Sequence, residues 1–505
     1  MVRIGIHSGL ARNATAGIVA IAWACAIAGA GAILAACAVG PDYRPSAPKA
    51  PAAWVSQGSD GLTDKASTPA SWWASFHDSE LDSLIERAVK SNLDLRVAEA
   101  RLRQARAVRG GSAADLWPAF SADASADRAK QSEHQPLIGS LPLPPSFPFE
   151  YSVYQAGFDA SWEIDVFGGK RRALEASTAD WQAAIEARND ALVSLLAEVA
   201  RNYVELRGTQ QRLSIARRNL KLQEEELDLT RARLQGGIAT DLDVTRSAAL
   251  RDGVQAAIPP LETEQRAAIY ALAVLLAKQP GELLDELSPP AALPVAPPVI
   301  PIGLPSELLR RRPDVRRAER QLAAETARIG VAKSEWFPKF SLTGDIGDES
   351  TKTSNWFDAG SRFWSIGPSL QWNVFDFGRV RAQVRAQTAV QEAALANYQK
   401  AVLVSLQEAE NAVTGYAQEQ NRHRALAASL AENRRSLELA ESLYDHGRVN
   451  FLDVLDARRA LYEADDQLAV SDQGIALDLI ALYKAMGGGW EAQPPAPASA
   501  TAARP

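Results

Sequence analysis

Residues 185–237 read IEARNDALVSLLAEVARNYVELRGTQQRLSIARRNLKLQEEELDLTRARLQGG and form the core of a proline-free stretch that begins after Gly169. Apolar residues recur in this stretch at strict intervals of seven: Ile185, Leu192, Val199, Leu206, Leu213, Leu220, Leu227 and Leu234. A helix of about 65 residues is roughly 100 Å long. A sustained seven-residue period keeps its apolar face buried only if neighbouring helices wind around each other left-handedly. The stretch therefore predicts one long helix in a coiled-coil wall.

The same unit occurs twice in the chain. Residues 162–168 (WEIDVFG) resemble residues 372–378 (WNVFDFG), and residues 237–244 (GIATDLDV) resemble residues 447–454 (GRVNFLDV). Both pairs are 210 residues apart, so the two long helices are equal in length. Because 210 is a multiple of seven, the column carries over to Leu395, Val402, Ala409, Tyr416, His423, Leu430, Leu437 and Tyr444. An internal duplication of one elongated unit is therefore predicted.

The N-terminus has the features of an export signal. Arg3 and Arg12 precede an Ala-rich apolar run that ends in Leu34-Ala35-Ala36-Cys37. This ending resembles the bacterial lipobox, which implies an S-diacylglycerol and an N-palmitoyl group on Cys37 after cleavage. Several acyl chains on one residue make a stable membrane anchor. Ala38 resembles the residue found there in lipoproteins sorted to the outer membrane; the alternative is an ordinary signal peptide with a chance cysteine.

Composition divides the chain into six segments. We expect a lipoprotein signal peptide at 1–36, a lipid-anchored tether over the surface at 37–75, a first repeat at 76–288, a Pro-rich linker at 289–304, a second repeat at 305–487 and a disordered tail at 488–505. Within each repeat, a helix is expected to precede the strands, at about 79–114 and at 305–333. Each of these helices ends at an aromatic-proline step.

The period changes to two after these helices. Apolar residues alternate with polar ones from Phe120 to Ala126, from Tyr154 to Val166, from Phe340 to Ile346 and from Trp364 to Val374. This pattern is typical of strands with one apolar and one polar face. A soluble sandwich and an outer-membrane barrel both fit it, and the tryptophans near the strand ends together with the lipid anchor favour the barrel. Four strands cannot close a barrel that needs about eight, so the chain must oligomerise, and the period leaves the copy number open.

Positively charged residues occupy the first turns of both long helices. They are Lys170, Arg171 and Arg172 in the first repeat and Arg379, Arg381 and Arg385 in the second. They oppose the helix dipole, so we expect them at the headgroup layer, with a merely solvated charge run as the alternative.

Pro259-Pro260 falls inside the returning helix of the first repeat only, which predicts a bend in that copy.

The sequence carries no sign of enzymatic chemistry. The net charge is −7 and the cations are scattered, so no basic face marks a nucleic-acid binder. The five histidines have no metal-ligand spacing, and His423 falls in the apolar column, which predicts a core residue. There is no phosphate-binding glycine loop and no catalytic triad in a plausible frame. We expect no enzyme activity, no metal and no cofactor other than the lipid on Cys37.

Several motifs resemble one family: residues 303–314 (GLPSELLRRRPD), residues 327–342 (ARIGVAKSEWFPKFSL) and residues 451–457 (FLDVLDA). They resemble the outer-membrane-factor or TolC-like family, in the lipoprotein (NodT-type) branch of resistance-nodulation-division efflux systems, over roughly residues 40–487. The resemblance implies an α+β membrane protein built from two internal repeats. In it, a long coiled-coil α-helical barrel continues into a transmembrane β-barrel, and three chains share both.

The same resemblance implies the function and the partners. It predicts a passive exit duct in the outer membrane of a Gram-negative bacterium, with the helical tunnel in the periplasm, for drugs or other toxic small molecules. The expected partners are two further copies of the chain, a periplasmic adaptor protein, an inner-membrane resistance-nodulation-division pump and outer-membrane lipid. An exit duct for type I protein secretion is a close alternative. A structural coiled-coil spacer is a more distant one, because a spacer has no need of amphipathic hairpins.

Candidate sites follow at the ends of the long helices. Two glycine-containing turns are expected to dock the adaptor, with Gly236, Gly237 and Thr240 in one turn and Gly447, Arg448 and Asn450 in the other. Apolar contacts there are expected from Leu242, Val244, Leu452 and Val454. The resemblance implies that Asp453 and Asp456 line a periplasmic gate. Asp453 stands three residues after Asn450, as Asp243 does after Thr240, so both carboxylates are also expected to cap a helix.

Overall fold

The structure is a computed structural model that describes residues 38–45, 50–55, 62–63, 70–132, 149–295, 300–301 and 303–492. The predicted signal peptide, Cys37, the Pro-rich loop 136–148 and most of the predicted tail lie outside these ranges. Two compact units divide the chain. The strand unit comprises Met1–Pro45, Gln104–Trp181 and Arg320–Leu395, and the helical unit comprises Ser46–Arg103, Gln182–Glu319 and Ala396–Pro505.

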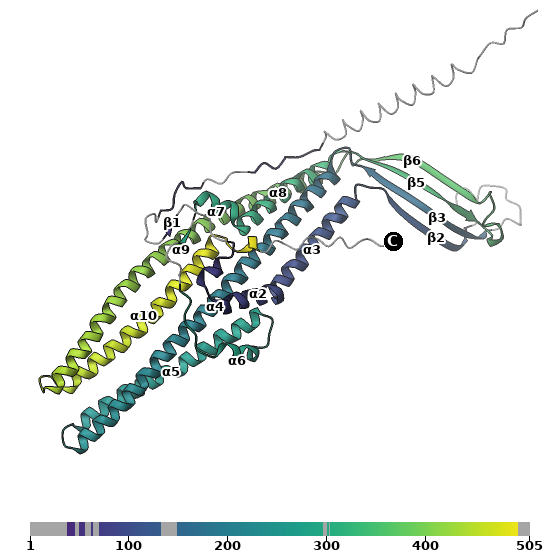
Figure 1. Ribbon diagram of the computed structural model, residues 1–505. Coiled ribbons are helices and arrows are strands. Elements are labelled where there is room, and N and C mark those ends of the chain that lie inside the picture. Colours follow the sequence, from purple (N-terminus) through teal and green to yellow (C-terminus); the bar gives the residue numbers. More distant parts are fainter. Residues whose placement is uncertain are drawn as a thin grey trace, which may run out of the picture. The chain divides into compact units, whose positions relative to one another are not determined.

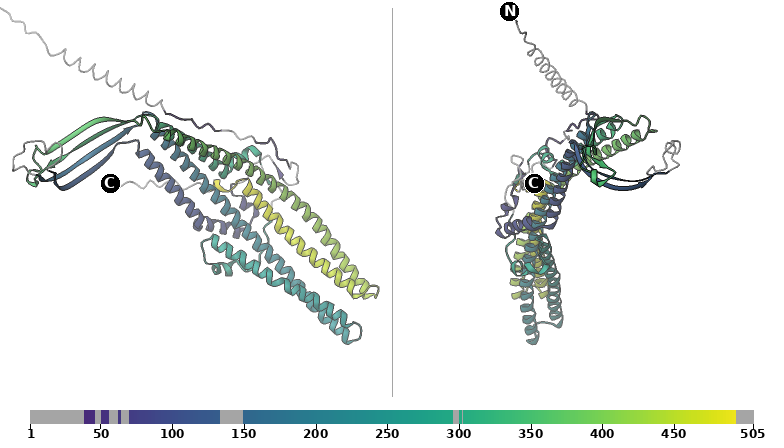
Figure 2. Two further views of the ribbon diagram at one scale, coloured as in Figure 1. Left: turned by 180° about the vertical axis from the view of Figure 1, so that it is seen from behind. Right: turned by 90° about the vertical axis from the view of Figure 1, so that its right-hand side faces the viewer.

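The strands form one antiparallel sheet in the order β2-β3-β5-β6 (Figure 1). Their bounds are Ala119–Lys130 for β2, Glu150–Ile164 for β3, Lys339–Ser350 for β5 and Arg362–Gln371 for β6. One row across the sheet joins Ala122, Phe158, Ile346 and Trp364, and the neighbouring row joins Ser121, Asp159, Asp345 and Ser365. The predicted apolar and polar faces are therefore confirmed. The sheet is curved (Figure 2), and β2 and β6 each pair on one side only among the described strands.

The long helices are equal in length, as predicted. α4 (Gly169–Gln235) and α9 (Arg379–Asp445) each have 67 residues, and α5 (Asp241–Leu275) and α10 (Phe451–Ala485) each have 35. The hairpins α4–α5 and α9–α10 lie side by side in the helical unit (Figure 1). The middle of the seven-residue column is fully buried in both copies, at Leu192, Val199, Leu206 and Ala409. The middle of the predicted column is therefore buried, as heptad packing requires.

The helix expected at 79–114 is two helices, α2 (Ser79–Ser91) and α3 (Leu93–Ala114), and the one expected at 305–333 is α7 (Pro305–Arg311) and α8 (Pro313–Ser334). The breaks fall at Asn92 and Arg312. The Asn92 Nδ2 donates to the Leu275 carbonyl at 2.9 Å, and the Arg312 Nη1 donates to the Ala485 carbonyl at 3.0 Å. Leu275 and Ala485 are the last residues of α5 and α10. Each break therefore supplies a donor to a helix C-terminus that lacks one.

Arg312 holds a charge network as well as a helix end. Its guanidinium is buried and donates to Asp314 through Nε (2.9 Å) and Nη2 (2.8 Å), and also to Glu408 (2.6 Å). Burial raises the pKa of Asp314, but the hydrogen bonds and charge of Arg312 outweigh it and hold this pKa below its ordinary value. The resulting stabilisation is present above the ordinary pKa of an aspartate and is lost as the pH falls through the lowered one.

The tether does not merely lie over the surface, because its aromatic residues belong to the core of the helical unit. Trp54 is buried and its Nε1 donates to the Gly303 carbonyl at 2.8 Å. The 3-10 helix η1 (Trp72–Phe76) buries Trp72, Trp73 and Phe76, and Trp72 stacks on Tyr483 at 5.0 Å between ring centroids. The tether therefore contributes to the core of the helical unit before the boundary predicted at residue 75, and that boundary stays a prediction.

Residues 38–43 dock within the strand unit on the start of α4 and the end of α8. The Val39 N–H donates to the Phe167 carbonyl at 3.0 Å, and the Arg172 Nη2 donates to Asp42 at 2.6 Å. Gly40 lies so close to Gly330 that a side chain would not fit, since a Cβ on Gly40 would stand 2.4 Å from the Gly330 Cα. The segment after the predicted lipidation position is thus bound closely at a defined site, which we call the seat, formed by the start of α4 and the end of α8.

This seat corrects the headgroup assignment of Arg172. Arg172 is buried and its charge is used by Asp42 and Glu175, so it does not reach a membrane surface. Arg379, Arg381 and Arg385 are exposed, and their position at the headgroup layer stays a prediction.

The remaining elements connect the long helices. They are β1 (Leu62–Thr63), which pairs parallel with β4 (Ile300–Pro301), together with η3 (Pro280–Leu283), α6 (Leu284–Leu287), η4 (Thr353–Asn355) and η5 (Trp490–Ala492). α5 continues through Pro259 and Pro260 without interruption, and the bend expected there stays a prediction. No single helix in the described ranges is long and apolar enough to cross a membrane. α5 with the segment Pro280–Leu287, at 112° to it, meets that test only as a pair, by length and composition.

We predict that replacing Arg312 with Met destabilises the protein by about 1–3 kcal/mol, because the half-buried Asp314 and the carbonyl of Ala485 then lose their donor. The measurement is the unfolding midpoint of the purified protein in denaturant at neutral pH. Arg310, which is exposed and two residues away, is the matched control, and Arg310→Met should leave the midpoint nearly unchanged. Equal midpoints for the two variants would contradict the role given to Arg312.

Candidate functional site

The turns between the long helices share one backbone motif. After α4 the Ile238 N–H donates to the Arg233 carbonyl at 2.8 Å, and Gly237 has a φ of 73°. After α9 the Arg448 N–H donates to the Leu443 carbonyl at 2.9 Å, and Gly447 has a φ of 66°. This is a Schellman ending, in which a residue with positive φ closes the helix. The glycines at 237 and 447 are therefore required by the backbone.

The capping arrangement predicted at the starts of α5 and α10 is confirmed. The Asn450 N–H donates to the Asp453 carboxylate at 3.0 Å, and the Asp453 N–H donates back to the Asn450 Oδ1 at 3.2 Å. Thr240 and Asp243 form the same reciprocal pair. Hydrogen bonds from the backbone and hydroxyl of Thr240 lower the pKa of Asp243. Both carboxylates thus satisfy backbone donors that a helix start leaves free.

The apolar surface of the two tips differs in part from the prediction. Leu242 and Leu452 are exposed to 55% and 36%, as a docking role requires. Val454 is buried against Phe451 and Leu455, so it supports the hairpin and is not available to a partner. Sequence reasoning missed Ile238, which is exposed to 77%. Its place after Gly237 is the signal that could have identified it, because a residue just past a helix-ending glycine leaves the helix.

Asp453 and Asp456 are both exposed on the first turns of α10. Residues three apart share a helix face, so the two carboxylates lie on one side. Asp453 is engaged as a helix cap, whereas among the described residues Asp456 has no hydrogen bond or ion pair. The counterpart of Asp456 in the first repeat is Arg246. Asp456 therefore contributes an unneutralised charge that local structure does not explain.

Ion pairs fix the position of α10 against the other long helices. Arg458 donates to Glu226 of α4 at 2.7 Å and to Glu441 of α9 at 2.8 Å. Further along α10, Asp466 accepts two hydrogen bonds from Arg212 of α4, at 2.8 and 3.2 Å. Asp453 and Asp456 thus lie on a helix that forms ion pairs with both α4 and α9.

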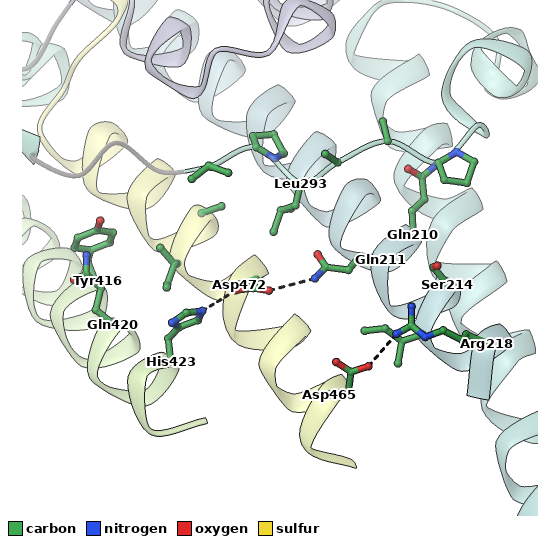
Figure 3. A pocket seen from close by; sticks show the side chains of 18 residues that line it. Gln210, Gln211, Ser214, Arg218, Leu293, Tyr416, Gln420, His423, Asp465 and Asp472 are labelled. Carbon is green, nitrogen blue, oxygen red and sulfur yellow. Dashed lines mark hydrogen bonds and ion pairs between the residues drawn. The ribbon is translucent and has the colours of Figure 1, made fainter. Parts of the chain in front are cut away.

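A cavity of 990 Å³ lies between α4, α9 and α10 under the linker after α6 (Figure 3). His423 and Gln211 approach the same carboxylate, Asp472, at 2.8 and 3.2 Å. Arg218 pairs with Asp465 at 3.0 Å on the same side. His423 is half-buried and lines this cavity, so the prediction of a core histidine is wrong. This position of the seven-residue column is occupied by a polar residue because His423 hydrogen-bonds to Asp472 of α10.

These groups form a structural polar network more readily than a reaction centre. Arg218 and Asp465 form an ion pair, and Asp472 is hydrogen-bonded to His423 and Gln211. In the described ranges, no group of three or more His, Cys, Asp or Glu side chains could hold a metal ion. The arrangement can tie the helices together, and the exposed carboxylates of α10 can act on ions electrostatically.

Comparison with known proteins identifies the family. The family model described as outer membrane efflux protein matches residues 84–278 and 304–488. Nodulation protein T of Rhizobium leguminosarum bv. viciae is 31% identical over 91% of this chain and 92% of its own length. The pyoverdine export outer membrane protein OpmQ of Pseudomonas aeruginosa is 31% identical over 91% and 95%. The solved structure of the outer-membrane channel OprN has a TM-score of 0.84 and 39% identity, covering 90% of this chain and all of that one. The chain therefore belongs to the outer membrane efflux protein family.

Proposed function

We propose that the chain is the outer-membrane exit duct of a tripartite efflux pump and passes toxic small molecules out of a Gram-negative cell. One observation supports this proposal: the chain combines two heptad helices of 67 residues each with an amphipathic sheet. Both edges of this sheet are unpaired in the described range. The helices suit a tunnel wall. The sheet suits a membrane pore, with its polar rows toward water and its apolar rows toward lipid.

Three copies make the duct. The sheet contributes four strands, and about eight are the fewest that close a barrel around side chains. Three copies give the twelve strands expected for the family. The helix tips dock a periplasmic adaptor, and an inner-membrane pump supplies the energy for transport. The relative named for pyoverdine export favours a small-molecule cargo over the protein cargo of type I secretion.

The anchor position fits the seat of residues 38–43. A lipid on Cys37 would be attached next to Ala38, whose Cα is close to Gly168 at the start of α4. We predict that Cys37→Ser abolishes labelling by radioactive palmitate and releases the chain to the periplasm or impairs its assembly. Labelling and fractionation of cells check this. Ser46→Ala, in the tether, is the control, and unchanged labelling of Cys37→Ser would refute the lipid anchor.

The tips provide a second test. Gly447→Pro should abolish efflux while the protein stays in the outer membrane, because proline fixes φ near −65° and removes the N–H that donates to the Tyr444 carbonyl at 2.8 Å. Gly447→Asn, which tolerates positive φ, should keep most activity. Drug resistance and crosslinking to the adaptor are the measurements. Normal values of both in Gly447→Pro would contradict docking at the tips.

The carboxylates of α10 provide the third test and the most direct one for a duct. Three copies would place six carboxylates of Asp453 and Asp456 around one axis, where they would select cations and bind multivalent ones. We predict that a trivalent cobalt ammine added on the periplasmic side blocks single-channel current in a planar bilayer. The double variant Asp453→Ala with Asp456→Ala should resist the block.

Asp243→Ala is the matched control, because it removes the equivalent cap from α5 without touching the proposed gate. This variant should be blocked like the wild type. Equal block of the wild type and the double variant would move the constriction elsewhere. A purified protein with no conductance at all would refute the duct itself.

A further inference from the structure

The cavity of 990 Å³ in the helical unit is covered by a strap of chain, residues 288–295, which follows α6 (Figure 3). Gln210 of α4 fixes the first end of the strap, because its Nε2 donates to the Ser288 carbonyl at 3.3 Å. The buried Pro294 fixes the second end. The strap therefore forms one wall of the cavity, and α4, α9 and α10 form the others.

Asp472 gives the cavity a charge that no lysine or arginine balances among the described residues. Its partners are the His423 ring at 2.8 Å and the Gln211 amide at 3.2 Å. A neutral imidazole and an amide supply hydrogen bonds but no charge. The other carboxylate of the lining, Asp465, is paired with Arg218 at 3.0 Å. With His423 neutral, the lining therefore carries one net negative charge, that of Asp472.

The equivalent carboxylate of the first repeat has a cation. The two helical hairpins are related by an offset of 210 residues, so the counterpart of Asp472 is Glu262 of α5. Glu262 accepts a hydrogen bond from Arg217 of α4 at 2.7 Å. The counterpart of Arg217 is Ala427 of α9, which carries no charge. The second repeat thus keeps the acid and lacks its partner.

The apolar side chain at the same place in the first repeat is also absent from the second. His423 corresponds to Leu213, which is buried and packs with Ala216 and Leu261. Positions 423 and 427 lie one turn apart on one face of α9. Two substitutions on this face thus place a polar ring in the cavity and leave the charge of Asp472 unbalanced.

We propose that this cavity binds an organic cation with an apolar body, such as a quaternary ammonium or phosphonium ion. Asp472 balances the charge of the ligand, and the strap covers its apolar part together with Ile215 and Ile475. This site goes beyond the proposed duct and does not depend on it, because it lies within one chain and uses neither the helix tips nor Asp453 and Asp456.

The size and the walls of the cavity fit such a ligand. Pockets for small molecules have volumes of roughly 300–1,000 Å³ and combine apolar walls with a few polar groups. Leu293 of the strap is directed toward the cavity (Figure 3), and both Leu293 and Ile475 are partly buried against the core of the helical unit. A water molecule occupies about 30 Å³ of the liquid. The cavity is therefore much larger than one or two bridging waters require.

The polar groups of the lining disfavour an anion and a metal ion. Arg218 is the one lysine or arginine among the described lining residues, and Asp465 already engages it. A metal ion requires several ligating side chains. In the part of the chain that the structure describes, no group of three or more His, Cys, Asp or Glu side chains could hold one. An organic cation needs only the charge of Asp472 and the apolar walls.

The test is binding of tetraphenylphosphonium to the full-length protein in lipid nanodiscs. Equilibrium dialysis measures it, and nanodiscs without protein give the background. Tetraphenylborate is the matched control ligand, because it combines a similar apolar body with the opposite charge. We expect saturable binding of one phosphonium ion per chain and no saturable binding of the borate.

Four variants locate the site. Asp472→Asn should weaken binding by about tenfold, as expected for the loss of one half-buried charge. Ala427→Arg should weaken it similarly by balancing Asp472, and His423→Leu should weaken it by filling the cavity. Glu262→Gln changes the equivalent carboxylate of α5, so it is the matched control and should bind like the wild type. Thermal unfolding followed by circular dichroism checks that each variant is folded.

The outcomes separate this site from the duct. Absence of saturable phosphonium binding, or equal binding of the borate, would overturn the site. Unchanged binding in Asp472→Asn together with lost binding in Asp453→Ala with Asp456→Ala would move the ligand to the start of α10 and would also overturn it. The duct has its own test in planar-bilayer conductance, so a protein that binds phosphonium but does not conduct would refute the duct and leave this site standing.

Discussion

Equal length of the long helices is the constraint on which the rest of this structure depends. One residue inserted into α4 would rotate every later side chain by about 100° and take Leu206 out of the core. It would also move the turn at Gly237 away from its counterpart at Gly447. Asn92 and Arg312 fix the other ends by bonding the last carbonyls of α5 and α10. Length, register and helix ends are therefore specified together.

Features that arise from regular repetition could be predicted from the sequence. The seven-residue column predicted α4 and α9, and the alternation predicted all four strands of the sheet together with their two faces. The capping pairs at Thr240 and Asn450 followed from spacing within one helical turn. These predictions depend only on residues that are close in sequence, because a period or a helix cap is determined by residues a few positions apart.

Features that depend on distant residues could not be predicted in this way. Asn92 and Arg312 break helices because helix ends almost 200 residues away require donors. Trp54 looked like part of a surface tether, yet the carbonyl that accepts its indole N–H belongs to Gly303. Arg172 looked like a membrane anchor, and its partner Asp42 precedes it by 130 residues. In each case the local sequence was compatible with the observed contact without specifying it.

Residues that differ between equivalent positions of the two repeats indicate which contacts each position makes. A contact within one chain forms when that chain folds, so a charge pair such as Asp180 with Arg328 meets its partner at a high effective concentration. A contact between copies must also offset the entropy of association, which apolar burial does better than an exposed ion pair. At the equivalent positions, 390 and 108, the chain carries exposed valines in place of this ion pair. Asp456 and its counterpart Arg246 also differ between the repeats, since the equivalent positions of the two hairpins carry opposite charges. Duplication thus supplied two similar backbones, and substitution at equivalent positions gave them different local charges and contacts.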